Sequence, residues 1–175
     1  MAIKQTPRIA LAARAAISLA VGLFLTFSQS HGAEIGLLAL GIFGLSFAVL
    51  TGLASVLFQK GLAAIENVPL VMVALLIGIF ALSATDDAMA FKFLVTGWAI
   101  IAGAFELYQA RRAGFKTAAG RDLLINSSFS LLLAVLFLLA PLDIVSQVGF
   151  FGAYLMMSGV HIGIAAASPA HSNAE

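Results

Sequence analysis

The stretch GWAIIAGAFELYQARR, residues 97–112, is typical of a membrane-spanning helix that ends in basic residues. Glu106 lies inside this stretch, five positions before Arg111. A bare carboxylate in hydrocarbon is costly, so a glutamate within a span usually faces protein and has a partner. The stretch therefore predicts a helix that packs in a bundle, with Glu106 on the side facing its neighbours.

The composition of the whole chain indicates an integral membrane protein. Of its 175 residues 62% are hydrophobic and 10% are charged, and the mean hydropathy is +1.08. A water-soluble domain has no use for so much apolar surface, so we expect lipid to solvate it. A net charge of +1 argues against binding nucleic acid, which requires a clustered basic surface. Without cysteine, disulfides and cysteine-bound metals are excluded, and we expect no cofactor.

Six apolar segments have the roughly 17–25 residues that a helix needs to cross a bilayer. They are residues 9–28, 35–58, 68–84, 89–110, 123–141 and 144–167. Pro7, Pro69, Pro141 and Pro169 fall at or just beyond their ends, where a missing N–H does no harm. We expect one all-α domain of six transmembrane helices.

The basic residues predict the orientation of these spans. Every lysine and arginine except Lys92 lies on or near one side, including Lys4 in the N-terminal segment. By the positive-inside rule the protein is multi-pass in the plasma membrane, with both termini cytoplasmic. One alternative remains open, because residues 4–30 also resemble a secretory signal with SQS as its cleavage site. Its removal would leave five spans and an external N-terminus.

The chain also contains an internal repeat. A shift of 56 residues superposes GIFALSA at 78–84 on GLFLTFS at 22–28 and on AVLFLLA at 134–140. The same shift relates Trp98 to Tyr154 and Gly103 to Gly159. We therefore expect three parallel helical hairpins, at about 9–58, 68–110 and 123–167, followed by a cytoplasmic tail at 168–175.

Small and polar residues mark the faces that should point into the bundle. Residues four apart share one face of a helix, and small residues there allow close packing in membranes. In the first helix of each hairpin this face carries Ala10, Arg14, Ser18 and Gly22; Glu66, Leu70, Ala74 and Gly78; and Asp122, Asn126, Ser130 and Ala134. Glu106 shares its own small face with Ala99, Ala102, Gly103 and Ala110.

Arg14 and Glu106 each lie about five residues inside the basic side of the membrane, which is roughly 7–8 Å at helical rise. Their equal depth and opposite charge suggest that they pair, with Asn126 as a hydrogen-bonding neighbour. Two alternatives remain. Arg14 reaches the headgroups unaided, and Glu106 meets Arg111 or Arg112 at the interface. As an intramembrane carboxylate, Glu106 is also a candidate titrating group.

Other candidate residues point to chemistry less specifically. His161 is expected on a bulky helix face as a packing residue, with proton sensing as a second reading because imidazole titrates near neutral pH. His31 and His171 lie in an external loop and the tail, so no metal site is expected. We find no phosphate loop, HExxH motif or nucleophile elbow, and the basic segment 111–122 is expected to be a flexible loop at the headgroups. These features argue against an enzyme.

Three segments together with the six spans resemble the HdeD-like acid-resistance membrane proteins. They are GWAIIAGAFELYQARR at 97–112, LFLLAP at 136–141 and GAYLMMSGVHIGIAAA at 152–167. The resemblance covers essentially the whole chain. It implies a small inner-membrane protein of acid or envelope stress and assigns no catalytic residue.

The sequence thus favours a non-enzymatic membrane protein that supports stress tolerance through an interior polar cluster of Arg14, Glu106 and Asn126. A second hypothesis is an accessory subunit, which packs through exposed small-residue stripes in a homo-oligomer or larger membrane complex. A third is a channel that conducts protons or solutes through the cluster.

Overall fold

The structure is a computed structural model, and it describes residues 8–60 and 65–168. The prediction of an all-α chain is confirmed, since all regular structure in these two ranges is helical. The helices are α1 (Arg8–Phe27), α2 (Ala33–Phe58), α4 (Val68–Ser83), α5 (Ala88–Ala113), α6 (Ala118–Leu139) and α7 (Ile144–Ala167). Lys4, Pro7, Pro169 and the tail beyond Ser168 lie outside the described residues.

The helices have the dimensions and surface of a membrane domain. All except α4 are long and apolar enough to cross a bilayer. Helix α4 is apolar but has 16 residues, a rise of roughly 24 Å, and Pro69 stands in its first turn. Large apolar side chains cover the outside of the bundle, among them Phe27, Val56 and Leu139, each about 80% exposed. The chain is therefore a multi-pass helical membrane protein.

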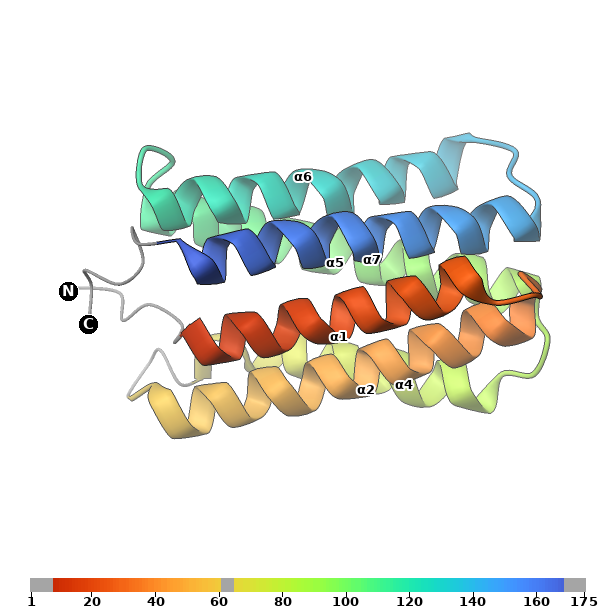
Figure 1. Cartoon of the computed structure of the whole chain (residues 1–175), viewed down its shortest axis with the longest axis horizontal. Helices are drawn as coiled ribbons and strands as arrows, with labels where there is room; N and C mark the ends of the chain where they lie inside the picture. Colours follow the sequence, from red (N-terminus) through yellow and green to blue (C-terminus); the bar gives the residue numbers. More distant parts are fainter. Residues whose placement is uncertain (1–7, 61–64, 169–175) are drawn as a thin grey trace.

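Local hydrogen bonds explain where several helices begin and end. Asp87 accepts hydrogen bonds from the backbone N–H groups of Met89 and Ala90, and so caps the start of α5. Asp143 caps α7 in the same way, through the N–H of Ser146. Both caps lie at the end of the bundle away from the start of α1 and the end of α7 (Figure 1).

The expectation of a flexible loop at 111–122 is wrong. Helix α5 runs through Arg112 to Ala113, and α6 already begins at Ala118. Gly114 ends α5 at a φ of +88°, which favours glycine. Thr117 then caps α6 by accepting a hydrogen bond from the N–H of Gly120 at 3.0 Å. These two residues replace the loop by a tight turn.

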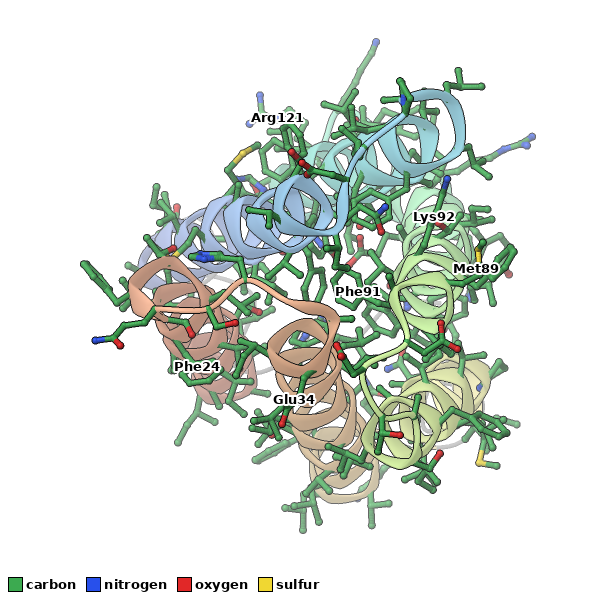
Figure 2. All side chains as sticks on the ribbon, turned by 90° about the vertical axis from the view of Figure 1, so that its right-hand side faces the viewer. Phe24, Glu34, Met89, Phe91, Lys92 and Arg121 are labelled. Carbon is green, nitrogen blue, oxygen red and sulfur yellow. The ribbon has the colours of Figure 1, made fainter. Side chains whose placement is uncertain are left out.

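The six helices form a closed ring. In order around it lie α1, α2, α4, α5, α6 and α7, and α7 packs again on α1 (Figure 2). The most extensive contacts join α1 to α7, α5 to α6 and α2 to α4. Each of these pairs joins the second helix of one predicted hairpin to the first helix of another, so the hairpins pack more closely on each other than internally.

Glycines make these close contacts possible, and they recur with the repeat. A Cβ atom on Gly103 of α5 would lie 2.8 Å from Leu131 of α6, and one on Gly159 of α7 would lie 2.8 Å from Leu19 of α1. The 56-residue shift carries the first contact onto the second, since Leu131 and Leu19 lie two repeats apart. The repeat in the sequence is therefore a repeat of helix packing.

An aromatic core fills the centre of the ring at the end away from the start of α1. Its largest side chains are almost fully buried: Phe43, Phe91, Trp98, Phe137 and Phe151. Phe91 points to the centre of the ring in Figure 2, whereas Phe24 and Met89 point outward. The rings of Phe43 and Trp98 meet edge to face at 5.4 Å, as do those of Phe91 and Phe151 at 5.8 Å.

Candidate functional site

The other half of the ring centre is a polar cavity of about 180 Å³. It lies where α1, α4 and α6 begin and where α2, α5 and α7 end, which is the left-hand end of the bundle in Figure 1. All six helices contribute to its wall, so no single hairpin encloses it. The polar wall residues within the spans include Arg14, Thr51, Ser55, Glu106, Gln109, Asp122, Asn126 and His161.

The structure brings Glu106, Arg14 and Asn126 together at the inner part of this cavity. Glu106 on α5 is only 5% exposed. Its Oε1 accepts a hydrogen bond from Asn126 Nδ2 of α6 at 2.6 Å and lies 3.7 Å from Arg14 Nη2 of α1. Its other oxygen, Oε2, is buried without a protein partner. Three helices thus meet at one carboxylate, which has one oxygen left for a further hydrogen bond.

Arg14 faces the bundle interior. Its guanidinium carbon lies 4.6 Å from the centre of the Phe47 ring on α2, where the cation interacts with the aromatic face. Its Nε is buried without a hydrogen bond. The alternative in which Arg14 reaches for the headgroups is therefore wrong, because Phe47 and Glu106 hold its charged end inside.

The second alternative, a pair between Glu106 and Arg111 or Arg112, is also wrong. Arg112 Nη1 lies 2.5 Å from Glu66 Oε1, at the mouth of the cavity. Arg111 is exposed on the outside of α5. Helical geometry is the reason, since Arg112 is nearly two turns beyond Glu106 and its side chain reaches the residues before α4.

Two hydrogen bonds around the cluster were not anticipated from the sequence. Ser158 Oγ of α7 donates to Asn126 Oδ1 at 2.5 Å, which adds a fourth helix to the cluster. Ser130 Oγ lies 3.1 Å from the hydroxyl oxygen of Tyr154 one helical turn deeper. Ser158 directly precedes Gly159, which packs on Leu19 of α1, and this position was the available signal.

His161 lies on the cavity wall but belongs to a different contact. Its Nε2 is 3.1 Å from the backbone oxygen of Asp122 and 3.9 Å from Asp122 Oδ1. Its ring meets Phe129 edge to face at 6.0 Å, which agrees with its expected packing role. Within residues 8–60 and 65–168, no group of three histidine or acidic residues is placed to hold a metal ion.

The arrangement holds one buried acid against one buried base in a polar recess. Its contacts provide charge compensation through Arg14 and hydrogen bonding through Asn126, while Glu106 Oε2 remains available to accept or carry a proton. Comparison of the chain with family models, with curated proteins and with solved structures finds no match.

Proposed function

We propose that this chain is a small, non-enzymatic plasma-membrane protein, similar to the HdeD-like proteins, that supports tolerance of acid or envelope stress. Both termini are cytoplasmic in this proposal, because the basic residues concentrate at the end of the bundle where α1 begins. The functional site in this proposal is the cluster of Glu106, Arg14 and Asn126.

The burial of Glu106 carries this proposal. A carboxylate 5% exposed inside a membrane bundle costs free energy, and a purely structural bundle would be more stable with an apolar residue there. Intramembrane acids mark functional sites in many membrane proteins, proton relays among them. The ring of six helices around the cluster provides the protein environment that such a group needs.

The experiment is survival of a deletion strain through an acid challenge. The strain is complemented at matched protein levels with wild type, with Glu106→Gln, or with Glu34→Gln as a control at an acid in the first turn of α2. We expect wild type and Glu34→Gln to restore survival and Glu106→Gln to fail. Equal survival of the deletion and wild-type strains at every pH would exclude the proposed role.

Two other functions are less well supported by the packing. An accessory subunit needs small-residue stripes on its surface, but Gly22, Gly78, Gly103 and Gly159 all contact neighbouring helices of the same chain. A conducting channel needs a path through the whole bundle, but the aromatic core fills the ring beyond the cavity. Native co-purification and flux measurements in proteoliposomes test these two alternatives.

A further inference from the structure

The cavity contains more polar groups than its own residues satisfy. Four residues that line it each have one buried polar atom without a hydrogen-bond partner: Glu106 Oε2, Arg14 Nε, Thr51 Oγ1 and Gln59 Oε1. A buried polar atom that stays dry and unpaired destabilises the protein. A cavity of about 180 Å³ has room for several water molecules, and its polar wall offers them the partners that buried water requires.

Among the described residues, those that line the cavity all lie in the half of the bundle where α1 begins. Its outer wall is made by Gln59, Glu66 and Arg112, which lie near helix ends on the side where α1 begins. At its inner end lies Arg14, whose guanidinium carbon is 4.6 Å from the centre of the Phe47 ring. The Phe47 and Trp98 rings pack edge to face at 4.9 Å, and Phe43 and Phe151 follow at 6.2 Å from each other. Water therefore has a polar route from one side and an aromatic barrier toward the other.

We propose that this cavity is an aqueous vestibule, which brings water and hydronium ions to the Glu106 carboxylate from the side where α1 begins, and from that side only. The transfer is simple: hydronium gives a proton to Oε2 and leaves as water, and the carboxylate becomes a neutral acid. The physiological meaning rests on the proposed function. With cytoplasmic termini, Glu106 responds to acidification inside the cell rather than to the external medium.

The charged groups around the cavity fit reversible protonation. Arg14 of α1 favours the carboxylate, and Asn126 of α6 hydrogen-bonds to it. Other titratable groups line the walls. They are Arg112 on α5, Asp122 on α6, His161 on α7 and Glu66 just before α4. Tyr154, also on α7, lies deeper and contacts Ser130. Helix α2 and the residue after it, Gln59, contribute no charged group to the wall; their polar residues there are Thr51, Ser55 and Gln59. Protonation of Glu106 therefore leaves Arg14 without its nearest counter-charge.

The absence of cysteine from the chain allows a direct test with single-cysteine variants. Thr51→Cys places a thiol on the cavity wall at a residue 6% exposed, and Thr96→Cys is its control in the other half, at a residue 7% exposed. Sealed vesicles of known orientation receive a membrane-impermeant cationic thiosulfonate, or Ag⁺ as a smaller probe, on one side at a time. Mass spectrometry then measures modification.

We expect Thr51→Cys to be modified from the side where α1 begins and not from the other, and Thr96→Cys to be modified from neither. Ala54→Cys, also on the wall, serves if Thr51→Cys does not fold. The proposal would be overturned if Ag⁺ modified the wall thiol from neither side, from both sides, or from the opposite side only.

A second readout follows the proton itself. Infrared spectra of proteoliposomes should contain a carboxylic-acid C=O band that is lost in Glu106→Gln and that follows the pH on the side where α1 begins. A band that follows the opposite pH, or a Glu106 signal unchanged by acid on the α1 side, contradicts the proposal. Neither readout depends on survival of the strain. If access is one-sided but the deletion strain survives acid as well as wild type, the stress role is rejected and the vestibule is still supported.

Discussion

At the scale of single residues, Arg14 and Glu106 should behave as a unit. Arg14→Met removes the cation and leaves a buried carboxylate without its counter-charge, so we expect a loss of about 3–5 kcal/mol in the free energy of unfolding. Adding Glu106→Gln should recover most of that loss, because no isolated charge then remains. Unfolding measured in detergent or bicelles gives both values.

The matched control for this pair is the ion pair at the mouth of the cavity. Arg112 and Glu66 form a shorter contact, but the Arg112 side chain is 45% exposed. Water and salt screen an exposed pair, so Arg112→Met should change stability much less than Arg14→Met. Independent, additive losses for Arg14→Met and Glu106→Gln would contradict the coupling.

Asp143 provides a pH dependence at the opposite end of the molecule. The hydrogen bond from the backbone N–H of Ser146 lowers the pKa of Asp143 below its ordinary value of 3.8. The charged form is therefore favoured by folding, and its stabilisation is complete above the unfolded pKa and lost as pH falls through the folded pKa. Asp143→Asn keeps a cap without a titrating charge.

We accordingly expect wild type to lose stability relative to Asp143→Asn as the pH falls from about 5. Thermal unfolding of both proteins over this range measures the difference. A constant difference between the two curves at all pH values would show that the cap charge contributes nothing.

The sequence was informative about the cluster because charge is rare in this chain. Arg14 and Glu106 stand out within apolar spans, and their equal depth follows from helical rise alone. The contact of Arg14 with Phe47 depends on which helix lies next to α1, and periodicity does not contain this information. The same reason explains why Ser158 was missed, since a serine within a span is common and costs little.

At the scale of helices, Gly44 and Gly97 make a matched pair for testing close packing. A Cβ atom on Gly44 of α2 would lie 2.8 Å from the backbone oxygen of Ala74 on α4, and backbone cannot rotate away. We expect Gly44→Ala to cost about 1–3 kcal/mol through overpacking. A Cβ atom on Gly97 meets nothing within 4 Å, so Gly97→Ala should be neutral or stabilising by up to about 1 kcal/mol.

Unfolding free energies of the two variants in the same detergent check this contrast. Equal effects at Gly44 and Gly97 would mean that helix propensity, rather than the contact between α2 and α4, determines the response.

Hydropathy located the six helices named above, and the expected bounds of the last one, 144–167, match α7. The errors lie where polar residues continue a helix beyond the apolar span. Residues 118–122 are helical although they include Arg121 and Asp122, because Thr117 caps α6 before them. Hydropathy reports the lipid-facing length, whereas caps and backbone hydrogen bonds determine where the helix begins.

At the scale of the whole molecule, closure of the ring between α1 and α7 can be tested by a disulfide. A Cβ atom on Gly163 would lie 3.7 Å from the Cβ of Ala15, within the range of about 3.5–4.5 Å for natural disulfides. The variant Ala15→Cys/Gly163→Cys should therefore oxidise readily. Alkylation followed by mass spectrometry counts the thiols that remain free.

The control pair for this experiment is Ala15→Cys/Gly97→Cys. Gly97 has open space around its Cβ position, with no atom of another helix within 4 Å. This pair should stay reduced within one molecule under the same oxidant. Equal oxidation of both pairs, or none in either, would contradict the contact between α1 and α7.

The order of the helices around the ring could not be predicted from the sequence. The repeat predicted three similar hairpins, but it did not determine whether each pairs internally or with its neighbours. Close approach decides this, because Gly22, Gly78 and their equivalents contact helices of other hairpins. Periodicity in the sequence predicted the number of hairpins. Their arrangement around the ring is determined by which helix surfaces fit together.

Because all six helices contribute to the cavity wall, the smallest fragment able to hold the polar recess is the chain from α1 to α7. A shorter piece would expose Glu106 or Arg14 to hydrocarbon. Helix α7, which carries Ser158 and packs on α1, is synthesised after α1–α6. Until α7 docks, the nascent bundle has an unfilled side between α1 and α6, and the polar recess is not yet enclosed.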